Sequence, residues 1–350
     1  MTKEFNYNYA DTVKNADINV KFPHQVELQP GRGCGFYKCP YCYGINQANN
    51  SDAELTLEQY EQLFSDIKGK VPLVTIAGIR TESLTSRHIS GIFKSINKNG
   101  LDLGLNTKGY LFTDEIINSM MTGIKEGSFI TFSLDSAINE YYDKIHGINA
   151  GTNSLNKVYE NMKKVFEIKK QNNLNIFITG SCLLFDGNSS FEDMEKFVTK
   201  FGPYSTRIRF SFPQTPNFSN DIPAYYVAHK EDVENNIIKL REKYPEYKIH
   251  FLKFNTDNHA TEFKYCYAQR FLFAIDYCGN VYPCPQVTVK EYKPLVIGNL
   301  HRNTFDEILN SDIRKKLFDT PIDDMKCRVC DRKDEEINTY LNIKHSDYHK

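Results

Sequence analysis

Residues 31–44 read GRGCGFYKCPYCYG and place three cysteines, Cys34, Cys39 and Cys42, in one glycine-rich loop. Glycines allow the backbone turns with positive φ that let a short loop wrap around a bound group. Three thiolates hold an iron-sulfur cube and leave one of its irons open, whereas structural zinc takes four protein ligands. We therefore expect an iron-sulfur site here, with a zinc knuckle that borrows His24 as the alternative.

The chain has nine cysteines, and the other six form a second group and two isolated positions. The second group comprises Cys266, Cys284, Cys327 and Cys330, and the isolated residues are Cys182 and Cys278. The first residues, MTKEFNYNYADTVKN, lack a positively charged segment followed by an apolar run, so we expect no secretory signal and a cytoplasmic protein. Thiols stay reduced in that compartment, which favours metal ligation over disulfides.

The composition is that of a folded globular chain. Of the 350 residues, 40% are hydrophobic and 25% are charged, which excludes a disordered or fibrous protein. The net charge of −1, from 43 basic and 44 acidic residues, gives no general attraction to nucleic acid or to an anionic membrane. No apolar run approaches the length of about 18 residues that crosses a membrane. We expect neither nucleic acid nor a membrane as a partner.

Short β-rich runs alternate with helical patterns along the first two thirds of the sequence. We expect strands at 24–29, 73–77, 101–105, 129–134, 175–182, 207–211 and 248–254. Apolar residues at helical spacing predict the helices between them, one capped by Thr56 with Gln59 and another by Thr113. The repeated order predicts an α/β fold, namely a partial (β/α)6 TIM-like barrel with a parallel sheet and helices outside.

Sites in such folds lie at the carboxyl ends of the strands. The first cysteine group follows the first expected strand, so it lies where a site is expected. The connection at 212–229 (FPQTPNFSNDIPAYYVAH) is long for a compact domain. We expect it to cover the substrate.

The pattern changes after about residue 250. Runs at 271–276 and 281–283 flank a hairpin that turns at Gly279. A helix capped by Thr304 follows, with these residues expected to face inward: Phe305, Ile308, Ile313 and Leu317. Pro321 ends it, and Cys327 and Cys330 open a charged helix. We expect an N-terminal segment at 1–24, the barrel at 25–255, and a small domain with a polar tail at 256–350.

The loop at 31–44 resembles the cluster loop of the radical S-adenosylmethionine (radical SAM) superfamily. The usual spacing there is three and then two residues, with an aromatic residue before the last cysteine. Tyr41 takes the aromatic position, whereas one extra residue separates Cys34 from Cys39. The resemblance implies a 4Fe-4S cluster whose open iron binds the amino and carboxylate groups of SAM. An electron from the cluster would cleave SAM to a 5′-deoxyadenosyl radical that takes hydrogen from carbon.

Other segments resemble cofactor-binding parts of the same superfamily, in the same order. Residues 77–83 (AGIRTES) stand where the family has Gly-Gly-Glu-Pro, and an ordinary exit from a strand is the alternative. Residues 106–109 (NTKG) resemble the family's Thr-Asn-Gly segment, and residues 133–135 (SLD) resemble the segment near the ribose and methionine. The resemblance implies these SAM-binding residues: Tyr41, Gly78, Glu82, Thr107, Ser133 and Asp135.

The second cysteine group resembles the twitch domain, a shortened relative of the SPASM extension in this superfamily. A hairpin would bring Cys266 and Cys284 together, and a tight turn from Cys327 to Cys330 would complete a four-thiolate site. The resemblance implies an auxiliary 4Fe-4S cluster, the second of two in the chain, while four thiolates also suit zinc. Full ligation by the protein favours a role in electron transfer.

Three further residues are candidates for catalysis. Cys182 and Cys278 are either buried small hydrophobes or, as in superfamily members that epimerise, donors of a hydrogen atom to a substrate radical. Arg207 and Arg209 alternate with apolar residues on a late strand, so one of them should point into the barrel. We take Arg209 as the candidate for binding a carboxylate or acting near an alcohol, with an ion-paired arginine as the alternative.

The sequence therefore predicts a radical SAM oxidoreductase or isomerase that dehydrogenates or epimerises a small polar substrate, such as a sugar, cyclitol or amino acid. Peptide-modifying members commonly carry a leader-recognition domain before the barrel, and only about 24 residues precede the first strand here. A ribosomally made peptide is the alternative substrate. A zinc-binding module without catalysis is the alternative from a different class. We expect a low-potential electron donor such as a flavodoxin or ferredoxin as a partner.

Overall fold

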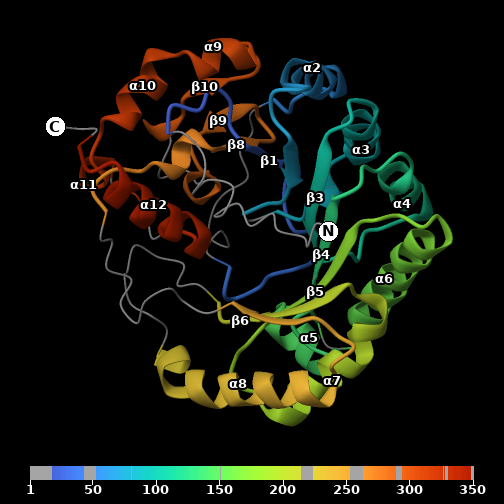
Figure 1. Cartoon of the computed structure of the whole chain (residues 1–350). Coiled ribbons are helices and arrows are strands. Elements are labelled where there is room, and N and C mark those ends of the chain that lie inside the picture. Colours follow the sequence, from blue (N-terminus) through green and yellow to red (C-terminus); the bar gives the residue numbers. More distant parts are fainter. Residues whose placement is uncertain are drawn as a thin grey trace.

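The computed structural model describes residues 18–42, 53–79, 81–149, 151–213, 224–252, 263–288, 294–325, 327 and 330–347. Across these residues, one curved sheet of ten strands forms the centre of the molecule, and helices follow its outer side (Figure 1). Seven consecutive parallel strands build the barrel: β1 (Gln25–Gln29), β2 (Leu73–Ile76), β3 (Asp102–Thr107), β4 (Phe129–Ser133), β5 (Phe177–Leu183), β6 (Arg207–Ser211) and β7 (Ile249–Leu252). The expected α/β fold with a partial barrel is confirmed.

Alternation along the strands separates an apolar outer face from a polar inner face. Val26 and Leu28 of β1 are fully buried in the main core, whereas Glu27 between them lines the inside of the barrel. Ile208 of β6 is likewise buried in the core, and its neighbour Arg209 faces inside. Successive side chains of a strand point to opposite faces. The core therefore lies between sheet and helices, and the barrel encloses a polar chamber.

Helices connect the barrel strands and bury their apolar sides against the sheet. They are α2 (Leu57–Ile67), α3 (Ile89–Lys98), α4 (Asp114–Met121), α5 (Asn139–Ile145), α6 (Ser154–Gln171), α7 (Phe191–Phe201) and α8 (Ala224–Lys243). Thr56 and Gln59 form the predicted reciprocal bonds at the start of α2, and Thr113 caps α4. In the part of the chain that the structure describes, no helix has the length and apolar character needed to cross a membrane.

The C-terminal part continues the same sheet. β8 (Leu272–Asp276) pairs in parallel with β1, and β9 (Asn280–Tyr282) and β10 (Gly298–Asn299) follow in antiparallel order. The predicted hairpin turns at Gly279, whose φ of +76° favours glycine. Four helices complete this part, coloured orange and red in Figure 1: α9 (Phe305–Leu309), α10 (Asp312–Phe318), α11 (Ile322–Met325) and α12 (Arg332–Lys344).

The prediction of a single helix after Thr304 is wrong, because two helices form there. Ser311 starts a new helix by accepting a bond from the Arg314 N–H at 3.2 Å, so the chain forms α9 and α10 instead. The break turns Ile313, which was expected to face inward, to the surface with 55% exposure. The expected boundary at 255–256 and residues 214–223 of the expected substrate-covering loop lie outside the described residues.

Candidate functional site

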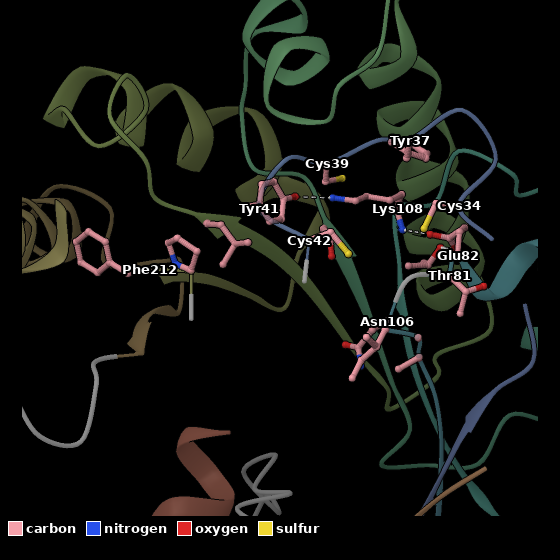
Figure 2. A pocket seen from close by; sticks show the side chains of 17 residues that line it. Cys34, Tyr37, Cys39, Tyr41, Cys42, Thr81, Glu82, Asn106, Lys108 and Phe212 are labelled. Atoms are coloured by element: carbon pink, nitrogen blue, oxygen red, sulfur yellow. Dashed lines mark hydrogen bonds between the residues drawn. The ribbon is translucent and has the colours of Figure 1, made fainter. Parts of the chain in front are cut away.

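The first cavity lies at the carboxyl ends of the barrel strands and has a volume of about 380 Å³. The cysteine loop after β1 lines one side of it, and the segments after β2 and β3 line the other (Figure 2). Eight residues predicted from the sequence meet here: Cys34, Cys39, Cys42, Tyr41, Gly78, Glu82, Thr107 and Ser133. Asp135, the remaining predicted SAM-binding residue, lies behind the wall and bonds to Tyr41.

Backbone hydrogen bonds fix the cysteine loop. The Cys42 N–H donates to the Cys39 carbonyl at 3.0 Å, which closes a tight turn between the last two cysteines. The Lys38 N–H donates to the carbonyl of His146 at 2.9 Å and ties the loop to the end of α5. The thiols are thus held at one end of the barrel by contacts from outside the loop.

The three thiols suit a cluster that keeps one iron open. Burial raises the pKa of Cys34 to about 12 and also raises the pKa of Cys39, and coordination to a metal displaces such protons. Within the described residues, no three His, Cys, Asp or Glu side chains converge closely enough to hold a single metal ion. Three thiolates from one loop can hold a four-iron cube and leave its fourth iron open.

A buried network of charges supports the loop from behind. Lys108 Nζ lies 3.1 Å from the Tyr41 hydroxyl, 3.3 Å from the Asp135 carboxylate and 2.5 Å from His146 Nε2. Asp135, 1% exposed, also accepts bonds from the Tyr41 hydroxyl at 3.0 Å and the Leu183 N–H at 2.8 Å. Burial favours its neutral form, but Lys108 and His146 outweigh burial and hold the pKa of Asp135 below its usual value. Burial lowers the pKa of His146 to about 4, so the imidazole is neutral.

Glu82 is held by the end of β3. The Thr107 hydroxyl donates to one carboxylate oxygen, and the Lys108 N–H donates to the other at 2.7 Å. Glu82 is 5% exposed, and burial raises its pKa despite these bonds. The segments after β2 and β3 therefore form one unit at the cavity wall.

No signal in the sequence points to the roles of Lys108 and His146. Lys108 lies within the NTKG segment that resembles the family's motif. The sequence does not show that the Lys108 ammonium contacts Asp135, which lies 27 residues later. His146 follows α5, a helix of seven residues that apolar periodicity does not reveal. Only the packing of α5 against the cysteine loop makes this histidine part of the site.

The four cysteines of the second group come together beside α12. Asn338 Nδ2 lies 3.6 Å from Cys266 Sγ and 4.0 Å from Cys330 Sγ. Burial raises the pKa of Cys266 to about 11 and that of Cys327 to about 12. Burial, together with nearby acidic groups that include the other thiols, also raises the pKa of Cys284 and Cys330. Four thiols that influence one another suit a cluster with every iron bound by protein.

A second cavity, also of about 380 Å³, occupies the inside of the barrel. It shares four wall residues with the first cavity: Ala77, Gly78, Ile79 and Asn106. Pro285 and Asp331, the sequence neighbours of Cys284 and Cys330, also line it. The chamber therefore adjoins both cysteine groups.

The candidate catalytic residues lie in three different places. Arg209 lines the second cavity, and so does Arg207, because residues two apart on a strand share a face. Cys182 is 2% exposed and borders a small void with Phe197 of α7, on the helical side of the sheet. Cys278 is 2% exposed within the β8–β9 hairpin. The structure thus brings Arg209 to the chamber but does not bring either thiol there.

Known families match both parts of the chain. Residues 28–198 match the radical SAM superfamily, and residues 266–331 match the SPASM iron-sulfur cluster-binding domain. A curated relative is the cysteine-type anaerobic sulfatase-maturating enzyme of Clostridium novyi (strain NT), 39% identical over 59 residues. That match covers 17% of this chain and 15% of the length of the relative.

Solved structures share the fold at low sequence identity. SuiB from Streptococcus suis bound to S-adenosylmethionine has a TM-score of 0.62 and 13% identity, over 87% of this chain and 69% of SuiB. SuiB bound to the precursor peptide SuiA has a TM-score of 0.63 and 12% identity, over 89% of this chain and 69% of SuiB. Native anSMEcpe with bound AdoMet has a TM-score of 0.59 and 14% identity, over 93% of this chain and 96% of anSMEcpe.

The two family matches cover the two parts of the chain that carry the cysteine groups. The chain belongs to the radical SAM superfamily and carries a SPASM-type iron-sulfur domain after its barrel, so its cofactors are S-adenosylmethionine and 4Fe-4S clusters.

Proposed function

We propose that this chain is a maturase that modifies a residue of a peptide or protein. The observation that carries the proposal is the second cavity, which shares wall residues with the first and is also lined by neighbours of the second cysteine group. Its volume of about 380 Å³ lies within the range of ligand-binding pockets. The sequence favoured a small polar substrate, but the similar proteins support a peptide. SuiB was solved with a precursor peptide, and the curated relative is a sulfatase-maturating enzyme.

The cysteines divide into two ligand sets in this proposal. Cys34, Cys39 and Cys42 hold the SAM-binding cluster, and the auxiliary cluster is held by Cys266, Cys284, Cys327 and Cys330. When bound, the first cluster and SAM supply the one-electron chemistry that removes a hydrogen atom from carbon.

The protein's own side chains position these groups. Tyr41 and Lys108 connect the cysteine loop to the buried carboxylate of Asp135, so the loop stays in place on the barrel. Glu82, anchored through both oxygens, belongs to the segment that resembles the family's motif for the amino group of the cofactor, and we propose that role for it. The inner faces of the strands then hold the substrate residue between the two ligand sets.

The full-length protein, reconstituted anaerobically with iron and sulfide, tests this proposal. Peptides encoded by short genes beside its own gene would be supplied in deuterated form with SAM and a reductant. We expect a changed peptide mass and deuterium in the released 5′-deoxyadenosine. Deuterium transfer from a deuterated sugar, cyclitol or free amino acid, with none from the peptides, would restore the small-molecule alternative. A colourless protein with about two zinc ions and no cleavage of SAM would support the binding module instead.

A further inference from the structure

We propose that the second cavity selects a substrate residue with a positively charged side chain. The inference rests on the proposed function, because it takes the cavity as the place where a peptide residue enters. The argument comes from the charges and the unsatisfied polar atoms that line the cavity.

One wall of the cavity is acidic. Glu27 of β1, Asp331 before α12 and Asp334 of α12 line it, with Lys333 as the cation among them. Lys333 Nζ lies 3.6 Å from Asp334 Oδ1. Among the described residues of this wall, three carboxylates lie with one ammonium; Glu27 also accepts a bond from Gln29 Nε2 at 3.0 Å, and burial raises its pKa to about 7. Buried carboxylates without enough cations are costly, so an added positive charge stabilises this wall.

Two buried polar atoms on the cavity wall point to a ligand that donates hydrogen bonds. Asp334 and Thr75 of β2 are each 3% exposed, and both line the cavity. Asp334 Oδ1 and Thr75 Oγ1 have no hydrogen-bond partner among the described residues. Asp331, in contrast, accepts a bond from the Lys333 N–H at 3.1 Å and so caps α12. The Lys333 ammonium pairs with Asp334 Oδ1 at 3.6 Å, which is beyond hydrogen-bond distance, so a bound ammonium or guanidinium can still donate a hydrogen bond to that oxygen and to Thr75 Oγ1. Leaving a buried acceptor without a hydrogen bond costs about 1–3 kcal/mol.

The opposite wall is basic. Arg207 Nε donates to the Thr179 hydroxyl at 2.8 Å, and Arg209 Nη2 donates to the Ser181 hydroxyl at 2.9 Å, so both guanidinium groups are anchored on β5. β1 and β6 are separated by four strands of a curved sheet and face each other across the barrel (Figure 1). A cation is repelled from β6 and attracted to β1 and α12. The carbonyl groups of the same substrate suit the arginines.

Direct binding to the full-length, reconstituted protein with SAM tests this charge preference. The probes are N-acetyl-lysine amide, N-acetyl-norleucine amide, which lacks the ammonium, and N-acetyl-glutamate amide. Anaerobic calorimetry without reductant measures each dissociation constant. We expect the lysine probe to bind about tenfold more tightly than the norleucine probe, the usual size for a hydrogen bond to a charged group. Asp334→Asn should remove the difference, and Asp312→Asn, whose side chain is 99% exposed on α10, should retain it.

Each outcome bears on one proposal. Equal binding of the lysine and norleucine probes, or tighter binding of the glutamate probe, would overturn the charge preference even if a peptide is modified. A clear lysine preference in a protein that modifies no peptide would leave the charge preference standing and count against the maturase. If Asp334→Asn loses iron, Glu27→Gln repeats the comparison from the barrel side, and an unchanged preference in that variant would also overturn the inference.

Discussion

Gly147 shows how a single residue far from the cysteines in sequence sets their position. Its φ is +60°, and a Cβ built there would collide with the carbonyl oxygen of Lys38 in the cysteine loop. The Lys38 N–H also bonds to the carbonyl of His146. The backbone beside Cys39 is therefore fixed from α5 by one close approach and one hydrogen bond.

We expect Gly147→Ala to weaken the first cluster, because the new methyl group must displace the loop. Iron after anaerobic reconstitution should fall from about eight to about four per chain, the value for one 4Fe-4S cluster. Gly151→Ala is the matched control, since Gly151 also has a positive φ, of +85°, but open space where its Cβ would be. Equal iron loss in both variants would assign the effect to backbone strain and not to the contact with Lys38.

Cys42→Ala tests the proposed ligand set at the same scale. Removing one of three ligands should leave about four irons per chain, those of the auxiliary cluster. Formation of 5′-deoxyadenosine should fall below detection. Cys182→Ala should keep both the iron and SAM cleavage, because that thiol faces α7 and not the chamber. Normal SAM cleavage by Cys42→Ala would refute the ligand assignment.

Helices and strands differ in how far the sequence predicts them. The barrel strands could be placed to within two residues, because dense β-branched and apolar runs flanked by turn residues are typical of buried parallel strands. α5 could not, since its seven residues show no apolar repeat. Glu27 and Thr75 could not be recognised as walls of a cavity either. A polar residue in an apolar strand can be assigned to a cavity wall only once the curvature of the sheet is known.

The capping box of α2 gives a prediction at the scale of the element. The Thr56 hydroxyl accepts a bond from the Gln59 N–H at 3.3 Å, and the Gln59 side-chain oxygen accepts one from the Thr56 N–H at 2.9 Å. Thr56→Ala should lower the free energy of unfolding by about 1 kcal/mol, because an N-terminal donor of the helix loses its partner. Urea unfolding followed by circular dichroism measures the change. Thr56→Ser keeps the hydroxyl and should stay near wild type; a loss as large as that of the alanine variant would contradict the capping role.

At the scale of the whole molecule, the two matched domains share one sheet and one core. β8 pairs with β1 from Gln25 through Gln29, so the first barrel strand has a C-terminal neighbour on one side and β2 on the other. Phe273, Ile275 and Phe305 belong to the same core as Val26. The second cavity also takes part of its wall from α12. The auxiliary domain is therefore proposed to be a structural part of the barrel and not an appendage.

A chain that ends at residue 256 should consequently fail to fold as a soluble monomer. Without β8, β1 becomes an exposed edge that invites aggregation, and the core around Val26 loses Phe273 and Ile275. We expect precipitation on expression or large aggregates in size-exclusion chromatography. The full-length Cys327→Ala/Cys330→Ala variant separates loss of the cluster from loss of the fold: it should remain soluble, keep about four irons and still cleave SAM. A soluble truncated monomer that cleaves SAM would show that the barrel closes without β8.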